Sequence, residues 1–174
     1  MAVLRIRHAP DPVLKRKTTR VQKIDAVLQR LIDDMLETME AAHGVGLAAN
    51  QVGISLRLAV IGIPAEEEGQ PREDYVLINP EMIKKGGERL VDEGCLSIPG
   101  YRGKLTRAEW VKVKATDREG KEYRLKAEGL LAQALEHELD HLNGALYLER
   151  MREQDTMDTL TAIDEREMVE AAAG

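Results

Sequence analysis

The sequence predicts an α+β domain in which mostly antiparallel strands pack around one central helix, with an N-terminal amphipathic helix and a C-terminal helix. Three observations support this class. Apolar residues recur at helical spacing over residues 24–39, side chains alternate over Trp110–Thr116, and a strongly apolar stretch at 128–142 follows predicted strands. The chain has 174 residues and no internal repeat, which suits one domain with a real core.

The N-terminal part of the chain predicts an irregular entry followed by a helix. Two prolines within residues 1–23 disfavour regular structure there. Over residues 24–39 the apolar positions step by three and one, which is typical of a helix with a broad apolar face. Asp25 is placed to cap the start of this helix, and Gly44 follows its last turn as a C-terminal stop.

The middle of the chain predicts short strands joined by turns. The apolar run at residues 57–63 suggests a buried strand. The alternation over residues 110–116 suggests a half-buried strand whose lysines face water. The predicted strands are residues 57–63, 75–79 (ended by Pro80), 110–116, 121–127 and a short one at 145–148, whereas residues 93–100 are predicted as a loop.

The central helix is predicted over residues 128–142 and contains the pattern H-E-x-x-H. If the segment is helical, His137 and His141 lie one turn apart on the same face. Two imidazoles at that spacing can bind one metal ion, and Glu138 between them can reach a water on that metal. A catalytic site usually has three protein ligands, and the candidates for the third are a distant Glu or Asp, His8, His43 or Cys95.

The composition limits the function classes. The net charge of −6 gives no electrostatic reason to expect nucleic acid or an anionic membrane as a partner. No run of 18 apolar residues is present and the N-terminus lacks the apolar stretch of a signal peptide, so the expected location is the cytoplasm. Cys95 is the single cysteine, so no intrachain disulfide is expected.

Three segments together carry a specific resemblance. Residues 44–51 read G-V-G-L-A-A-N-Q, residues 93–97 read E-G-C-L-S, and residues 133–141 read Q-A-L-E-H-E-L-D-H. In this order and at compatible spacings they resemble the three motifs of peptide deformylases. The resemblance covers about residues 4–150 and includes further short matches, at residues 11–14, Ile98, Pro99, Arg102 and 107–109.

The resemblance implies a reaction and a set of roles. The reaction is metal-dependent hydrolysis that removes the formyl group from formyl-methionine of newly made polypeptides. Glu138 would act as general base and then as general acid, with Gln51 and the backbone N–H of Leu96 as the oxyanion hole. The implied metal ligands are Cys95, His137 and His141, with water in the fourth position. The metal would be Fe(II) in cells, while Zn, Ni and Co also suit these ligands.

The implied substrate site consists of two groups. Val45, Gly46 and Gly94 would present backbone groups to an extended peptide. The residues expected to line or support the pocket for the methionine side chain are Val91, Glu93, Leu130, Gln133 and Ala134.

The sequence departs from the family pattern at three positions. Gln133 replaces an apolar residue found in many relatives, which makes the methionine pocket more polar. His43 stands where Glu is often found, and Glu136 where Gln is frequent. Asp140 is either an outer partner that orients a ligand histidine or a surface charge.

The C-terminal part is expected to be an extension of the catalytic domain. We expect residues 1–150 to form that domain and residues 151–174 to form an acidic, helical extension. Residues 149–174 carry eight acidic and three basic residues, which argues against docking on the ribosome through a basic tail.

Two other function classes stay open. A different H-E-x-x-H hydrolase, such as a peptidase, leaves Gln51 and the segment around Cys95 unexplained. A non-catalytic metal-binding module would need four protein ligands, and the sequence offers three good ones plus Glu138.

Overall fold

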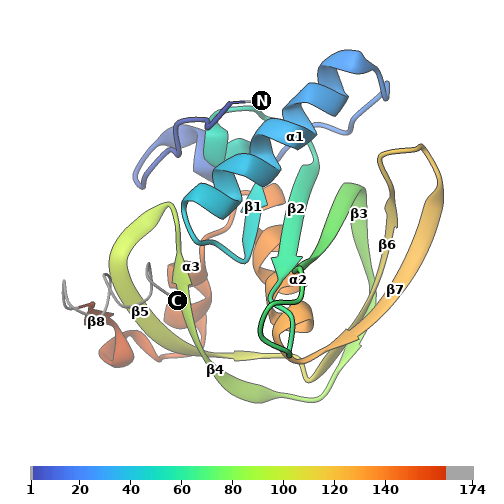
Figure 1. Cartoon of the computed structure of the whole chain (residues 1–174). Helices are drawn as coiled ribbons and strands as arrows, with labels where there is room; N and C mark the ends of the chain where they lie inside the picture. The colour runs from blue at the N-terminus through green and yellow to red at the C-terminus, as the bar shows by residue number, and fades with distance from the viewer. Residues whose placement is uncertain (1, 164–174) are drawn as a thin grey trace.

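The computed structural model describes residues 2–163 and confirms the predicted α+β class (Figure 1). Five antiparallel strands form one sheet in the order β1-β2-β3-β6-β7, and three form a second in the order β4-β5-β8. The strands of the first sheet are β1 (Gly46–Ala48), β2 (Leu58–Ile63), β3 (Glu73–Gly86), β6 (Trp110–Thr116) and β7 (Glu122–Glu128). Those of the second are β4 (Arg89–Cys95), β5 (Ile98–Arg107) and β8 (Thr161–Ala162). The α-helices are α1 (Ala26–Ala41), α2 (Gly129–Leu142) and α3 (Tyr147–Glu153).

The strand β2 separates two parts of the hydrophobic core. Leu58 and Val60 pack in a cluster with the apolar side chains of α1, whereas Ala59 and Ile61 point to the other face and pack with those of α2. Because successive side chains of a strand point to opposite faces, a strand covered on both faces needs an unbroken apolar run. The predicted strand at 57–63 is therefore confirmed as a strand between two helices.

The central helix α2 lies between the two sheets (Figure 1). Its buried apolar residues include Ala132, Leu135 and Leu142, which join the cluster under the five-stranded sheet. The polar residues of its H-E-x-x-H pattern are buried as well. The helix ends as predicted at Asn143 and at Gly144, whose φ is +80°.

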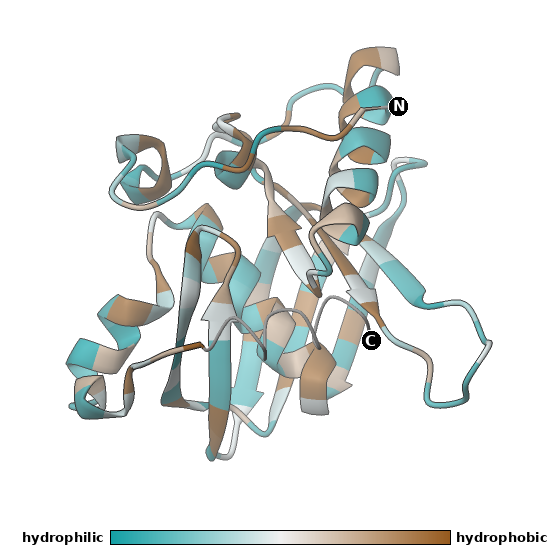
Figure 2. Ribbon diagram, turned by 60° about the vertical axis from the view of Figure 1, so that its left-hand side comes forward, coloured by the Kyte–Doolittle hydropathy of each residue, from teal (hydrophilic) through white to brown (hydrophobic). Residues whose placement is uncertain are grey.

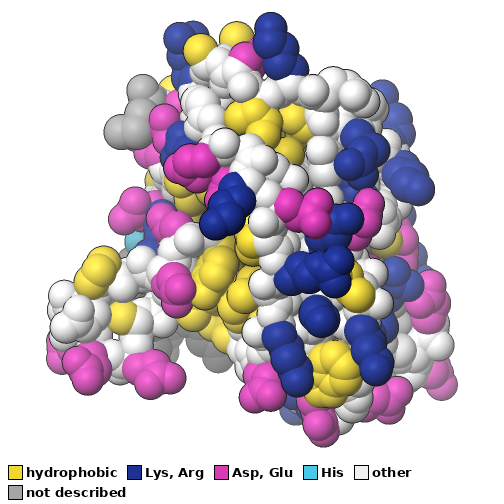
Figure 3. All heavy atoms as spheres, turned by 90° about the vertical axis from the view of Figure 1, so that its right-hand side faces the viewer, with side chains coloured by type: hydrophobic (Ala, Val, Ile, Leu, Met, Phe, Trp, Pro, Cys, Tyr) yellow, Lys and Arg dark blue, Asp and Glu magenta, His cyan; other side chains and the backbone are white. Residues whose placement is uncertain are grey.

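Amphipathic patterns account for the outer elements. In α1 hydrophobic and hydrophilic residues alternate along the helix (Figure 2), and the Asp25 side chain accepts a hydrogen bond from the backbone N–H of Leu28 as the predicted cap. In β6 the residues Val111 and Val113 face the core, and Lys112 and Lys114, which alternate with them, are partly exposed on the outer face. Figure 3 shows lysine and arginine side chains gathered on this side of the molecule.

Three expectations about secondary structure are wrong. The strand predicted to stop at Pro80 continues as β3 to Gly86, since a register shift between Ile78 and Glu81 places Pro80 where no ladder hydrogen bond is needed. The expected short strand at 145–148 is instead the approach to α3 and its first turn.

The predicted stop after α1 is confirmed, because the helix ends at Ala41 and the Gly44 N–H donates to the Met39 carbonyl at 2.9 Å. The residue with the left-handed conformation there is His43, with a φ of +56°. The third wrong expectation concerns a single position. Cys95 is the last residue of β4 and not part of a loop.

The expected C-terminal helix is confirmed only in part. α3 ends at Glu153 and is followed by a 3-10 turn, Met157–Thr159, and by β8. Residues 164–174 of the expected helical extension lie outside the described residues. The division at residue 150 falls inside α3 and stays a prediction. No helix of the described part is long and apolar enough to cross a membrane.

Candidate metal and catalytic site

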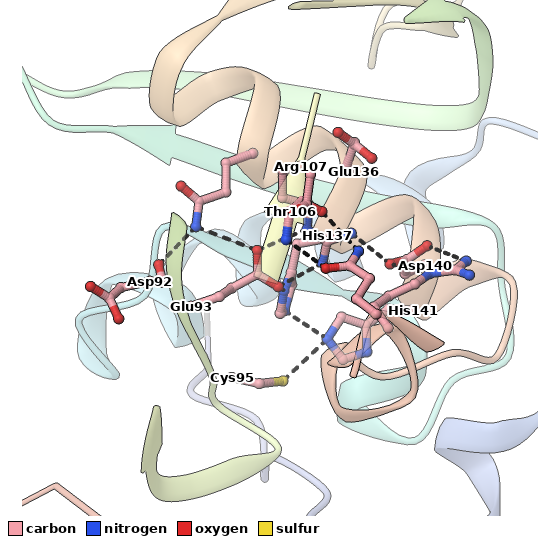
Figure 4. Close-up of polar contacts among 12 residues, drawn as sticks. Asp92, Glu93, Cys95, Thr106, Arg107, Glu136, His137, Asp140 and His141 are labelled. Atoms are coloured by element: carbon pink, nitrogen blue, oxygen red, sulfur yellow. Dashed lines mark hydrogen bonds and ion pairs between the residues drawn. The ribbon is translucent and has the colours of Figure 1, made fainter. Parts of the chain in front are cut away.

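Cys95, from the end of β4, meets two histidines of α2, His137 and His141 (Figure 4). The Cys95 Sγ lies 3.2 Å from the His141 Nε2, which lies 3.0 Å from the His137 Nε2. Within the described chain these are the residues whose ligand atoms could hold one metal ion. His8 and His43, the other histidines, are not part of this group.

These atoms lie a few tenths of an ångström closer together than ligand atoms around a shared ion. Ligand atoms bound about 2.0–2.3 Å from one tetrahedral ion lie about 3.3–3.6 Å apart, against 3.2 and 3.0 Å here, so a small outward shift of the side chains would admit an ion. Burial lowers the pKa of His141 well below its usual value, and the neighbouring His137 charge lowers it further, so the His141 imidazole is neutral and able to bind a metal. A thiolate and two imidazoles suit Zn, Fe(II), Co or Ni.

The Glu138 carboxylate is buried beside this group. One of its oxygens, Oε2, has no hydrogen-bond partner in the described structure. The other, Oε1, faces Gly46 so closely that a Cβ atom at position 46 would overlap it. In the metal-free chain burial raises the pKa of Glu138 to about 7, and nearby charges act in both directions. A carboxyl with such a pKa can both accept and donate a proton near neutral pH.

A buried carboxylate holds the ring of His137. The Glu93 Oε2 lies 2.7 Å from the His137 Nδ1, and Arg107 donates to both Glu93 oxygens at 2.6 and 3.0 Å. Burial alone would raise the pKa of Glu93, but the charges and hydrogen bonds of His137 and Arg107 lower it to about 2. With Nδ1–H donating to Glu93, the Nε2 of His137 is directed toward Cys95 and His141.

Asp140 does not contact His137 or His141 through its side chain, nor is it a free surface charge. Its Oδ2 accepts from the Arg107 Nη1 at 2.8 Å, and both of its oxygens are bound by Arg150 of α3. Asp140 thus reaches His137 only through Arg107 and Glu93, and its role as an outer partner stays a prediction. The residue in direct contact with His137 is Glu93, which was expected to line or support the methionine pocket.

The buried Gln51 side chain approaches the cysteine. Its amide nitrogen is 3.7 Å from the Cys95 Sγ and donates to the Ser97 hydroxyl at 3.1 Å, while its oxygen accepts from the Ala48 N–H at 2.9 Å. The Ser97 N–H also points at the sulfur, at 3.4 Å. Gln51 and the turn after β4 thus both direct N–H donors at the site.

A cleft of about 780 Å³ opens onto these groups. Of the expected substrate residues it is lined by Val45, Gly46, Glu93, Gly94, Leu130, Gln133 and Ala134. Val91 does not line it, because its side chain packs in a core cluster with Leu105, Tyr147 and Met151. The Val45 carbonyl accepts a hydrogen bond from Gly62 of β2 at 2.8 Å, so that carbonyl is already used within the sheet.

The amide of Gln133 is also engaged. It donates to the Asp92 carbonyl at 3.0 Å and approaches the Glu93 carboxylate at 3.4 Å. The polar end of Gln133 therefore binds β4 at the wall of the cleft, and the more polar methionine pocket stays a prediction.

The comparisons agree with this geometry. Residues 3–157 match the family model of polypeptide deformylases. The peptide deformylase of Dehalococcoides mccartyi is 53% identical over 95% of this chain and 96% of its own, and that of Chromobacterium violaceum is 49% identical over 96% and 98%. The chain belongs to the peptide deformylase family. It is accordingly an enzyme, a deformylase.

Solved deformylase structures share the fold. The crystal structure of the Legionella pneumophila deformylase matches with a TM-score of 0.79 at 45% identity, over 90% of this chain and 94% of that one. The Ehrlichia chaffeensis deformylase in complex with actinonin matches with a TM-score of 0.82 at 37% identity, over 98% and 94%.

Sequence reasoning missed three residues that surround the deformylase site. Arg107 was noted only as part of a short family match, while Tyr147 and Arg150 were not singled out. The Tyr147 ring stacks beside that of His137, with centroids 6.3 Å apart. No local pattern marks these residues, because their contacts with α2 and β4 form only through the tertiary fold.

Proposed function

We propose that this chain removes the formyl group from the N-terminal formyl-methionine of newly made polypeptides, with Glu138 as general base and then general acid. The observation that supports this most is the position of the Glu138 carboxylate. It is buried against Gly46, lines the same cleft as Cys95 and His137, and has one unpartnered oxygen. A base in that position can reach a water held at the metal site.

The proposed roles of the other residues follow from their contacts. Cys95, His137 and His141 would hold one divalent metal, Fe(II) in cells, with Zn, Ni or Co as alternatives. When bound, the metal polarises the formyl carbonyl and makes water more acidic. Glu138 takes the proton from the attacking water and delivers it to the nitrogen of the leaving amine.

Gln51 and the Leu96 N–H would stabilise the negative oxygen of the tetrahedral intermediate. The Gln51 amide now donates to Ser97, so one of its N–H groups must turn toward the substrate. Losing one such donor typically costs about 10²–10³ in rate. The N–H and carbonyl groups of Gly46 and Gly94, on strands at the cleft, would bind the peptide backbone, because an extended peptide can pair with an exposed strand edge.

Leu130, Gln133 and Ala134 of α2 would contact the methionine side chain, with Glu93 and Val91 as supports behind the pocket. We further infer a cytoplasmic enzyme that meets its substrates as nascent chains. Contact with the ribosome would not use a basic tail. Deletion of residues 153–174 should then leave ribosome co-sedimentation unchanged, and a collapse of co-sedimentation would contradict this part.

The test compares two substrates and two variants. Metal-loaded protein should release formate from formyl-Met-Ala-Ser and leave internal bonds of unformylated peptides intact. Glu138→Gln should keep the metal and lose about 10²–10⁴ in kcat. Cleavage of internal bonds would favour a general H-E-x-x-H peptidase. Loss of both metal and fold in Glu138→Ala would favour a structural metal site.

A further inference from the structure

The short helix α3 lies behind the candidate metal site and outside all three family-like motifs. It nevertheless contacts the site twice, through Tyr147 beside the His137 ring and through Arg150. Its buried Met151 fixes the helix against Gly103 of β5. The α3 helix is thus attached to both layers that position the metal-binding side chains.

The contacts of Arg150 begin a series of ion pairs that leads inward. The Arg150 Nη2 lies 2.9 Å from the Asp140 Oδ1, and its Nε lies 3.2 Å from the Oδ2. A planar guanidinium therefore binds both oxygens of this carboxylate, and such a bidentate pair fixes the orientation of the carboxylate. Asp140 side-chain exposure is 13%, so the carboxylate is mostly removed from water.

Asp140, held in this orientation, in turn binds Arg107. Its Oδ2 accepts from the Arg107 Nη1 at 2.8 Å, and the side chain of Arg107 is only 2% exposed. The remaining donors of Arg107, Nε and Nη2, bind Glu93, whose Oε2 meets the His137 Nδ1 at 2.7 Å (Figure 4). Charges alternate from the surface to the site, so each group holds the next in place.

We propose that Arg150 is a positioning residue for the metal ligand His137, acting through Asp140, Arg107 and Glu93. The inference rests on the proposed function, because it takes His137 as a metal ligand. A rigid guanidinium has one plane, so a carboxylate fixed at Nη1 determines where Nε and Nη2 place Glu93. Without Arg150, Asp140 loses two of the three nitrogen atoms that donate to it, and its carboxylate can rotate. Arg107 is then held less firmly, so the position of Glu93 against the His137 ring varies more.

The competing explanation is that Arg150 only anchors α3. Its side chain is 36% exposed, and partly exposed ion pairs often contribute little to stability. An anchor would affect unfolding without affecting the geometry of His137. The two explanations therefore differ in what happens at the metal site when the protein stays folded.

The experiment uses the full-length chain and Arg150→Met, with Arg150→Lys as the conservative variant. Glu153→Gln is the matched control. Glu153 is another carboxylate partner of Arg150, at 3.0 Å, but it is not part of the series from Arg150 to His137. Cobalt affinity is measured by competition with a chelator. The Nδ1–H signal of His137 is measured by proton–nitrogen NMR on the metal-free protein.

We expect Arg150→Met to weaken cobalt binding about 3–10-fold, less than the 10–100-fold typical of a direct outer partner. The His137 Nδ1–H signal should shift or broaden, and kcat should fall more than KM rises. Arg150→Lys should restore part of each effect, and Glu153→Gln should match the unmodified chain. Asp140→Asn, which keeps the shape but not the charge, provides a second test with a larger effect if Arg150→Met folds poorly.

The proposal would be overturned if Arg150→Met and Asp140→Asn both lowered the unfolding temperature but left the cobalt affinity and the His137 Nδ1–H signal unchanged. These two readouts need no substrate. If the unmodified chain binds cobalt but releases no formate, the proposed function fails while the positioning of His137 is still tested.

Discussion

Gly46 lies so close to the Glu138 carboxylate that no side chain fits between them. The contact joins the edge strand β1 to the central helix, and it makes glycine necessary for space and not for backbone conformation, since Gly46 has no positive φ. Two family-like motifs thus meet at one point of the cleft.

Gly46→Ala should therefore displace Glu138 and reduce activity. A methyl group at position 46 would overlap the Oε1 oxygen, and a buried carboxylate has little room to move. We expect kcat to fall about 10²-fold or more, as for loss of a general base, with metal content retained. Gly44→Ala is the comparison, because its methyl would meet the flexible end of Leu96 and should cost less. Equal activity in Gly46→Ala and the unmodified chain would contradict the contact.

The metal-free chain should lose stability as the pH rises, because of Glu138. Its pKa is raised from 4.5 to about 7 in the folded chain, so the fold favours the protonated carboxyl. The contribution of Glu138 to the stability of the fold is fully present below pH 4.5, where the carboxyl is protonated, and is lost as the pH rises through 7. The difference is of order 3 kcal/mol at 1.36 kcal/mol per pKa unit.

Chemical unfolding of metal-free protein at pH 5 and pH 8 gives the measurement. Glu138→Gln, which cannot ionise, should show a smaller loss of unfolding free energy than the unmodified chain over that range. The same loss in both proteins would mean that Glu138 does not titrate there.

Arg107 should be required for both stability and metal binding. Arg107→Met leaves the Glu93 and Asp140 carboxylates without their shared cation, and removing one partner of a buried pair typically costs about 3–5 kcal/mol. Glu93→Gln should weaken metal binding about 10–100-fold, since Glu93 holds the His137 ring. The double variant should be less destabilised than the sum of the two single ones. Additive free energies would argue that the two residues act separately.

The docking of α3 depends on a glycine in β5. A methyl group at Gly103 would overlap the end of Met151, which is fully buried. We expect Gly103→Ala to lower the free energy of unfolding by about 1–3 kcal/mol, the usual cost of overpacking. The double variant Gly103→Ala/Met151→Ala should be less destabilised than the sum of the two single variants, because the methyl at position 103 then meets no side chain; thermal unfolding can measure this. Additive losses of stability would show that the contact is not the cause.

The sequence by itself determined the features that depend on local spacing. The helix at 128–142, the Asp25 cap, the hairpin of β6 and β7, and the placement of His137 and His141 one turn apart all follow from periods of 3.6 and 2 and from turn residues. The group of Cys95 with these histidines was expected from family resemblance. Physical reasoning on the residues had left four kinds of third ligand open.

Only the tertiary structure decided the contacts between distant segments. The Cys95 thiol reaches α2 because β4 and β5 form a separate layer, and Pro80 is tolerated because a bulge in β3 removes the need for its N–H. Glu93 proved to be a partner of His137, and Val91 a core residue. Such pairings depend on how sheets pack against α2, and residues that are dozens of positions apart carry no local signal of the partner they will meet.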